Sequence, residues 1–184
     1  MNLRLTNFDA SWTLFLDRDG VINTKVDNDY IKRWNDFHFI SGVLSSMPIL
    51  RKKFNRILVV TNQQGIGKGL FTEHDLAEIH TKMQTEFLNS GCKIDKVYYC
   101  PALHAENSVY RKPNIGMALQ AKKDFPEIDF SKSIMVGDSI SDMEFGKNAG
   151  MKTAFINSIK TKNTQANIID WVFPSLEDFT KSLE

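Results

Sequence analysis

The sequence predicts an α/β fold, a doubly wound and mostly parallel sheet with helices on both faces. Six short runs rich in β-branched and aromatic residues are apolar throughout, as expected for parallel strands that are covered on both faces. Stretches in which apolar residues recur at helical spacing lie between these runs, so strands and helices alternate along the chain. The six predicted strands are residues 12–16, 57–60, 97–99, 134–136, 153–156 and 171–173.

The first two predicted helices are marked by apolar stripes, one over residues 43–54 and one over residues 76–87. Thr72, three residues ahead of Asp75, is typical of a capping box at the start of the second helix. Gly91 lies where a residue in the left-handed conformation would end that helix. Both ends of the second helix are therefore predicted from local signals.

The other two predicted helices are marked by boundary residues. Pro113 is well placed to begin the third, because proline favours the first helical position. The fourth spans residues 142–149 and ends at Gly150. The polar stretch 158–167 is expected to be a loop with a frayed helix.

Length and composition indicate one globular domain over residues 1–184. Hydrophobic residues make up 42% of the chain and charged residues 24%, which gives no sign of disorder. A formal net charge of +1 and a pI near 7.8 argue against a dedicated nucleic-acid binder, which normally carries a basic stripe. We expect neither a nucleic acid nor a membrane as partner, and a monomer.

The compartment is predicted from segments that the sequence lacks. The N-terminus has no apolar core of a signal peptide, and no later apolar stretch approaches the roughly 20 residues that span a bilayer. We therefore expect a cytoplasmic protein. In that compartment Cys92 and Cys100 would stay reduced, and both are expected to be small buried hydrophobic residues.

Two acids directly follow the first predicted strand, in the segment Asp17-Arg18-Asp19-Gly20. The carboxyl end of a strand is where open α/β sheets place their chemistry. Gly20 allows a sharp turn, so both carboxylates can reach one small site. Two acids in one pocket repel each other, and a divalent cation, a shared proton or a nearby lysine would have to join them.

Three further segments carry polar residues near predicted strands or helices. Residues 61–65 offer a hydroxyl, amides and a turn whose backbone N–H groups suit a phosphate. Residues 111–113 place two cations just before a predicted helix, and residues 138–142 supply a second pair of acids after a strand. Asp17 and Asp19 together with these three segments offer a nucleophile pair, phosphate donors, a neutralising charge and a set of metal ligands.

The four segments, in this order, resemble the haloacid dehalogenase superfamily of aspartate-nucleophile phosphatases. The resemblance implies a Rossmann-like sheet and a phosphoryl group that is passed first to Asp17 and then to water. It implies that Asp19 protonates the leaving oxygen and then deprotonates the attacking water. Lys112 would neutralise both the nucleophile and the phosphate.

The resemblance also implies Mg²⁺, held by Asp17, the backbone carbonyl of Asp19 and Asp138, with Asp142 binding a metal-bound water. Substrate contacts are implied for the following residues: Thr61, Asn62 and Gln63 at the transferring phosphate, and Arg111 and Lys68 at a more distant phosphate or hydroxyl.

No insertion is long enough for a cap domain, so the site is expected to be shaped by loops. The motifs resemble those of the capless group that contains heptose bisphosphate phosphatases and histidinol-phosphate phosphatases. That group commonly has a zinc-binding loop, from which this chain departs. Cys100 is present, but Ala102, Ser108 and Tyr110 occupy the other ligand positions. Cys100 and His104 alone cannot form the closed four-ligand site of structural zinc, so none is predicted, and His104 is expected in a loop near the substrate.

The expected activity is removal of the 7-phosphate of D-glycero-D-manno-heptose 1,7-bisphosphate. Two alternatives remain open in the sequence: a histidinol-phosphate phosphatase, and a non-catalytic module that binds a phosphosugar. A polynucleotide 3′-phosphatase shares the fold, but the missing basic stripe counts against it.

Overall fold

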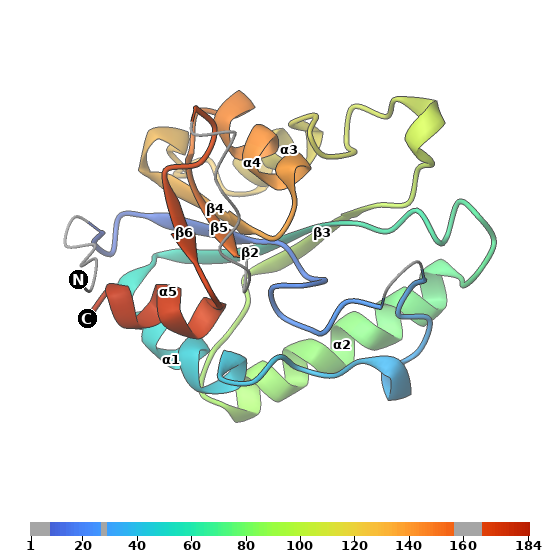
Figure 1. Cartoon of the computed structure of the whole chain (residues 1–184), viewed down its shortest axis with the longest axis horizontal. Helices are drawn as coiled ribbons and strands as arrows, with labels where there is room; N and C mark the ends of the chain where they lie inside the picture. The colour runs from blue at the N-terminus through green and yellow to red at the C-terminus, as the bar shows by residue number, and fades with distance from the viewer. Residues whose placement is uncertain (1–7, 27–28, 157–166) are drawn as a thin grey trace.

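A computed structural model describes residues 8–26, 29–156 and 167–184, and it confirms the predicted parallel sheet (Figure 1). The strand order is β3-β2-β1-β4-β5-β6, and every neighbouring pair is parallel. Each of the six predicted strands is present. They are β1 (Thr13–Leu16), β2 (Arg56–Asn62), β3 (Lys96–Cys100), β4 (Ser133–Gly137), β5 (Lys152–Ile156) and β6 (Trp171–Phe173).

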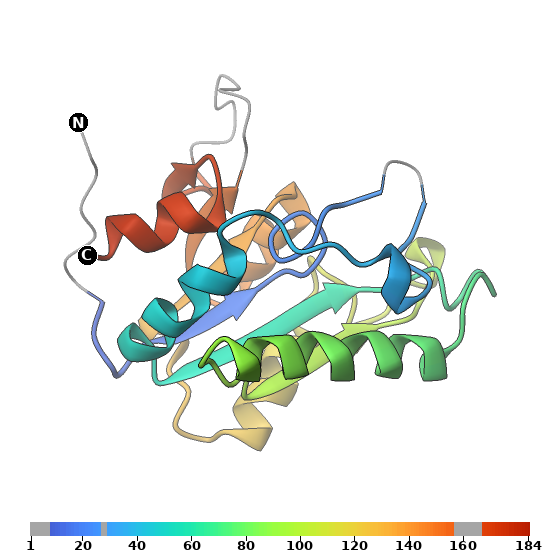
Figure 2. The same ribbon diagram turned by 90° about the horizontal axis from the view of Figure 1, so that it is seen from below.

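Helices cover both faces of the sheet, as Figures 1 and 2 show. One face carries α1 (Val43–Lys53), α2 (Glu73–Asn89) and α5 (Leu176–Ser182), and the other carries α3 (Gly116–Asp124) and α4 (Ile140–Asn148). Three short 3₁₀ helices, η1 (Trp34–Asp36), η2 (His104–Glu106) and η3 (Phe130–Lys132), lie in the connections. No helix in the described part of the chain is both long and apolar enough to cross a membrane.

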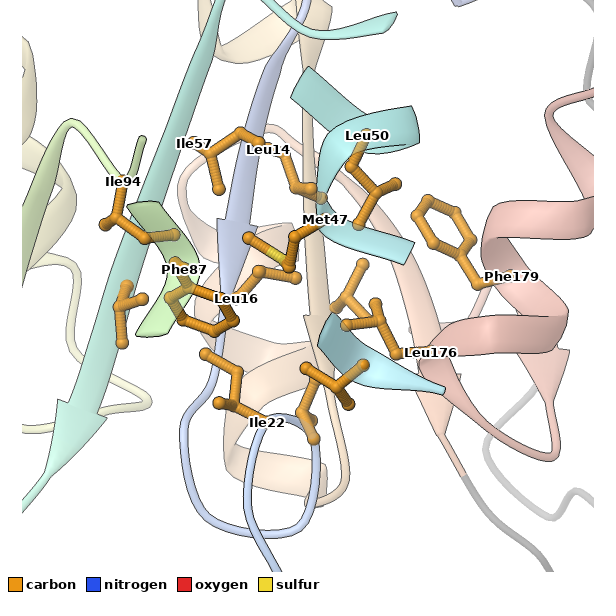
Figure 3. Close-up of a cluster of buried hydrophobic side chains, with 14 of the residues drawn as sticks. Leu14, Leu16, Ile22, Met47, Leu50, Ile57, Phe87, Ile94, Leu176 and Phe179 are labelled. Atoms are coloured by element: carbon orange, nitrogen blue, oxygen red, sulfur yellow. The ribbon is translucent and has the colours of Figure 1, made fainter. Parts of the chain in front are cut away.

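The side chains of β1 alternate between the two faces. Leu14 and Leu16 pack on the side of α1 and α2, where Met47 and Phe87 meet them, and Phe15 packs on the opposite side (Figure 3). All of these side chains are fully buried, and each contributes about 1.5–3 kcal/mol through its transfer from water. The alternation continues past the strand, so successive residues beyond Leu16 turn toward different layers.

The helix boundaries agree with the sequence signals in α2 and differ in α3. The capping box of Thr72 and Asp75 is formed, and Gly91 adopts a φ of 87° just after α2. The prediction that Pro113 begins the third helix is wrong, because α3 begins at Gly116. Residues 111–114 instead form a turn, with the Asn114 N–H donating to Arg111 O over 2.8 Å.

α5 was not predicted from the sequence. Its N-terminal signal is Ser175, whose side chain accepts a hydrogen bond from the Asp178 N–H. The loop with a frayed helix was predicted over residues 158–167. All of these residues except the last lie outside the described part of the chain. Cys92 and Cys100 are buried and free of disulfides, as expected.

The sheet order reverses at β1, which lies between β2 and β4. Leu16 is aligned with Val59 on one side and Val136 on the other. The residues that follow these three strands therefore emerge at one edge of the sheet. Such a reversal opens a crevice at the carboxyl ends of the strands, where α/β proteins bind ligands.

Candidate active site

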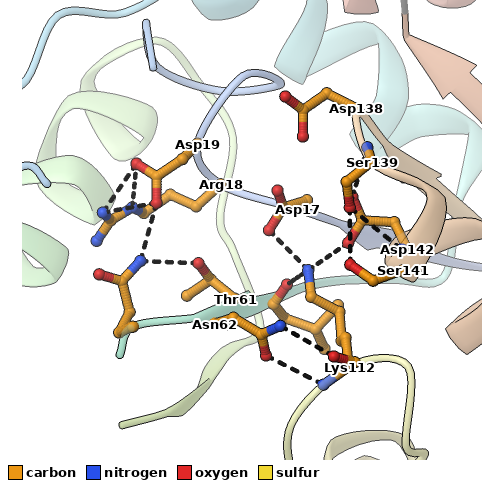
Figure 4. A network of polar contacts seen from close by, with 12 residues as sticks. Asp17, Arg18, Asp19, Thr61, Asn62, Lys112, Asp138, Ser139, Ser141 and Asp142 are labelled. Atoms are coloured by element: carbon orange, nitrogen blue, oxygen red, sulfur yellow. Dashed lines mark hydrogen bonds and ion pairs between the residues drawn. The ribbon is translucent and has the colours of Figure 1, made fainter. Parts of the chain in front are cut away.

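Three carboxylates meet at this crevice (Figure 4). Asp17 follows β1 directly, and its N–H donates to Val136 O over 2.9 Å, which fixes it beside β4. Asp138 and Asp142 come from the connection between β4 and α4. One carboxylate oxygen from each of the three lies within 4.8 Å of the others.

Two glycines allow the loops to approach this closely. Gly20 has a φ of 92°, and a Cβ there would lie 2.2 Å from the Asp138 Oδ2. A Cβ on Gly137 would lie 2.3 Å from the Asp142 Cβ. Any side chain at either position would push Asp138 or Asp142 away from Asp17.

Lys112 is the buried cation of the acid cluster. Its Nζ lies 2.7 Å from Asp17 Oδ1 and 2.6 Å from Asp142 Oδ1, and it donates to Val60 O over 2.7 Å. Burial lowers the pKa of Lys112, but the two carboxylates outweigh burial and raise the pKa above its ordinary value. Lys112 is therefore charged at every physiological pH.

Asn62 holds the backbone of Lys112 rather than pointing its amide freely into the crevice. The Lys112 N–H donates to Asn62 Oδ1 over 3.0 Å, and Asn62 Nδ2 donates to Lys112 O over 3.2 Å. The amide still lines the cavity beside Thr61. Asn62 thus connects the end of β2 with the turn that carries the buried lysine.

One lysine does not balance the acid cluster. Burial raises the pKa of Asp17 to about 7; Lys112 opposes this rise, and the charges of Asp142 and Asp138 add to it. Burial also raises the pKa of Asp138, against the effect of Lys25, whose Nζ lies 3.0 Å from Asp138 Oδ2. The Asp138 Oδ1 is buried and accepts no hydrogen bond from the described residues. A cluster of carboxylate oxygens with spare lone pairs fits a hard divalent cation.

Asp17 and Asp19 line the same cavity, as expected, but the Asp19 carboxylate is not part of the cluster of Asp17, Asp138 and Asp142. The Asp19 carboxylate is turned toward Arg18, whose Nη2 lies 2.9 Å from both oxygens (Figure 4). The carboxylate also accepts hydrogen bonds from Asn23 and Gln63. Burial raises the pKa of Asp19, but Arg18, Asn23 and Gln63 together outweigh burial and lower it. The side chain remains 24% exposed and lines the same cavity as Asp17.

The carboxylates surround a cavity of about 270 Å³. All of the predicted site residues line it except Gln63 and Lys68. Gln63 is buried behind the cavity, where its Nε2 donates to Asp19 and to Thr61 Oγ1 over 2.9 Å. Lys68 is exposed, and its Nζ lies 5.3 Å from the centre of the Tyr30 ring. His104 is also exposed and is not part of the lining.

The cavity also has lining residues that were not predicted as site residues, chiefly Lys25, Tyr30, Gln64, Ser139 and Ser141. The last three belong to the predicted segments 61–65 and 138–142, whereas Lys25 and Tyr30 lie outside all of them. Lys25 and Tyr30 belong to the long connection between β1 and η1, which carries no strand, helix or glycine-rich signal. Ser139 offers a signal that could have been used, because Ser139 and Asp142 have capping-box spacing and form that box. This cap directs Asp142 Oδ2 to Ser139 and leaves Oδ1 for Lys112.

Comparison with known proteins identifies the family. Residues 12–175 match a family described as polynucleotide kinase 3 phosphatase. The chain belongs to this family of haloacid dehalogenase phosphatases. Among the relatives of this chain is a D-glycero-alpha-D-manno-heptose-1,7-bisphosphate 7-phosphatase from Campylobacter jejuni. The two sequences are 40% identical over 78% of this chain and 80% of the relative's length. The D-glycero-beta-D-manno-heptose-1,7-bisphosphate 7-phosphatase of Escherichia coli is 36% identical, over 93% of each chain.

Solved structures agree with this assignment. A D,D-heptose 1.7-bisphosphate phosphatase from B. bronchiseptica, complexed with magnesium and phosphate, superposes with a TM-score of 0.82 at 25% identity, over 92% of this chain and 96% of its own. This haloacid dehalogenase phosphatase therefore shares the fold and the family of enzymes that hydrolyse phosphate monoesters.

Proposed function

We propose that the chain is a Mg²⁺-dependent phosphomonoesterase that removes the 7-phosphate of D-glycero-D-manno-heptose 1,7-bisphosphate through an aspartyl-phosphate on Asp17. One observation carries the proposal: Asp17 lies at the sheet reversal, within 2.7 Å of a buried lysine and among carboxylates suited to a divalent cation. Relatives that are 36–40% identical and span most of the chain support the substrate class.

In this proposal Asp17 attacks the phosphorus atom and Lys112 holds Asp17 ionised beside the negatively charged phosphate of the substrate. Asn62 keeps Lys112 in place through its backbone, and the Thr61 hydroxyl donates to a phosphoryl oxygen. These donors are fixed before substrate arrives, so little reorganisation accompanies the reaction.

Mg²⁺ would be held by Asp17, Asp138 and the Asp19 carbonyl, with Asp142 placed to bind a metal-bound water. When bound, it would neutralise phosphoryl oxygens and orient them toward Asp17. Asp138 Oδ1, which has no hydrogen-bond partner among the described residues, and the raised pKa of Asp17 both support a positive charge here in addition to Lys112 and Lys25.

Asp19 would transfer the protons. Its lowered pKa keeps it ionised in the free protein. A phosphate monoester has a second pKa near about 6, so the monoanion can bring the proton that Asp19 then passes to the leaving oxygen. In the second half of the reaction Asp19 accepts a proton from the water that attacks the aspartyl-phosphate.

Asp19→Asn tests this role. The amide keeps the size and polarity of Asp19 but cannot exchange the proton, so we expect kcat to fall by roughly 10²–10⁴-fold. KM should change less than threefold, because Thr61, Lys112 and Arg111 still bind substrate. Steady-state kinetics on p-nitrophenyl phosphate and on the bisphosphate measure both quantities, and an unchanged kcat would remove Asp19 from the mechanism.

Arg111 and Lys25 are proposed to bind the part of the substrate that lies farthest from the transferred phosphate. Arg111 lines the cavity, its Nη1 donates to Ala102 O over 3.3 Å, and its Nε is buried without a partner among the described residues. Lys25 also lines the cavity, with its Nζ 3.0 Å from Asp138 Oδ2. Two cations on a small cavity suit a substrate with a second phosphate.

A phosphate-release panel tests the substrate class. It contains the α and β anomers of the heptose 1,7-bisphosphate, histidinol phosphate, a 3′-phosphorylated oligonucleotide and p-nitrophenyl phosphate, each with Mg²⁺. We expect kcat/KM to be highest for a heptose bisphosphate. Faster cleavage of histidinol phosphate, or of the oligonucleotide, would replace the proposed substrate. Turnover of no compound, together with binding of the bisphosphate, would show a non-catalytic binding module.

A further inference from the structure

A fully buried arginine lies between the two acids that follow β1. Arg18 is 0% exposed, although its neighbours Asp17 and Asp19 both line the cavity. The alternation of β1 explains this placement, because Arg18 points to the same side as Leu14 and Leu16, toward α2. The guanidinium is thus inserted between the acidic edge of the sheet and a helix that contributes no residue to the cavity lining.

The guanidinium has a different partner on each side. Its Nη2 and Nε donate to the Asp19 carboxylate, and its Nη1 lies 3.1 Å from Nε2 of His80 in α2. The Phe37 ring centre lies 6.0 Å from the guanidinium carbon. His80 is 7% exposed and is separated from Arg18 by 62 residues in the sequence.

The contact determines the state of the imidazole. Arginine can only donate hydrogen bonds, so Nε2 of His80 must be the acceptor and carry no proton. Burial, and next the charge of Arg18, lower the pKa of His80 to about 3, although Asp19 acts in the opposite direction. His80 is therefore neutral under physiological conditions and offers Arg18 a lone pair. Because the imidazole carries no positive charge, it does not repel the guanidinium.

We propose that His80 is a positioning residue: it accepts a hydrogen bond from Arg18 Nη1 and so fixes the guanidinium that orients the Asp19 carboxylate. The inference builds on the proposed function, in which Asp19 transfers protons. With Nη1 held by α2, Nη2 donates to both oxygens of Asp19 and Nε donates to Oδ1. Without that acceptor, a buried N–H of a charged group is left unpaired, and the guanidinium must turn to find another partner.

His80→Leu and His80→Gln test the role, with Met83→Leu as the matched control. Leu fills a similar volume but accepts no hydrogen bond, whereas the Gln amide oxygen can replace Nε2. Met83 is fully buried in the same helix, one turn further along, and belongs to the hydrophobic core. We expect His80→Leu to lower kcat by roughly tenfold, as loss of a residue supporting a reacting group typically does. KM should stay within twofold, and His80→Gln should recover most of kcat.

A second readout follows the guanidinium itself. Side-chain Nη resonances of Arg18, assigned with Arg18→Lys, should be protected from solvent exchange in the wild type and in His80→Gln. In His80→Leu this protection should be lost, while in Met83→Leu it should remain. The NMR experiment needs no turnover, so it also decides the inference if the wild type proves to have no phosphatase activity.

Two results would overturn the inference. The first is a kcat for His80→Leu that equals that of Met83→Leu. The second is Arg18 signals that keep their protection in His80→Leu, which would show that α2 does not hold the guanidinium.

Discussion

Asp17→Asn is expected to remove measurable turnover, a loss on the order of 10⁴-fold or more, because Asp17 is the proposed acceptor of the phosphoryl group. The neutral amide oxygen of Asn is a poor nucleophile, although it can still accept the hydrogen bond that Lys112 Nζ now donates to Asp17 Oδ1 over 2.7 Å. The remaining donors still bind phosphate. Phosphate release from the bisphosphate and from p-nitrophenyl phosphate, measured with Mg²⁺, tests the loss.

The same variant should be more stable than the wild type in the absence of Mg²⁺. The pKa of Asp17 is raised from its model-compound value of 3.8 to about 7 in the folded protein. Between these two values the folded state holds the extra proton, so wild-type stability falls as the pH rises from about 4 to about 7. Asn has no charge and escapes this loss, so the melting temperature of the variant should exceed that of the wild type at pH 7.5.

Mg²⁺ supplies the matching control. A ligand that binds only the folded state raises its stability, so Mg²⁺ should raise the melting temperature of the wild type more than that of Asp17→Asn. Equal shifts would place the cation away from Asp17. Substantial turnover by Asp17→Asn would eliminate Asp17 as the nucleophile.

Lys112→Met is expected to have the second largest effect, on both activity and stability. Its Nζ contacts Asp17 and Asp142, and the side chain is 2% exposed. Removing it leaves two buried carboxylates without their cation, which typically costs about 3–5 kcal/mol. The pKa of Asp17 should rise further, so Asp17 would be protonated and non-nucleophilic at neutral pH. We expect a loss of turnover of roughly 10²–10³-fold from the missing charge at the phosphate.

Two further variants separate these effects. Lys52→Met removes an exposed lysine from α1 and should leave both kcat and the free energy of unfolding unchanged. Lys112→Met/Asp142→Asn removes one of the two unpaired carboxylates, so it should recover part of the stability measured by urea unfolding but none of the turnover. If Lys112→Met kept wild-type kcat, the buried cation would have only a structural role.

The strands could be predicted from the sequence because each is covered on both faces and is therefore apolar throughout. The site edge followed from the same pattern, since Asp17 and Asp138 directly succeed such runs. α5 and the start of α3 were harder to predict from the sequence. α5 is a short helix marked mainly by one serine cap, and the segment before α3 forms a turn of its own.

The sequence by itself determined which residues can meet at the carboxyl edge of the sheet, because local apolar patterns mark where each buried strand ends and which residues follow it. Only the tertiary structure decided how the charges pair there. Asp17 lies with Lys112, while Asp19 turns to Arg18, whose other side rests on His80 of α2. Lys25 and Tyr30 line the cavity, although no sequence pattern predicted it. Such pairings depend on distances between segments far apart in the chain, and on burial that sets the pKa of each group, and neither quantity is present in a local sequence pattern.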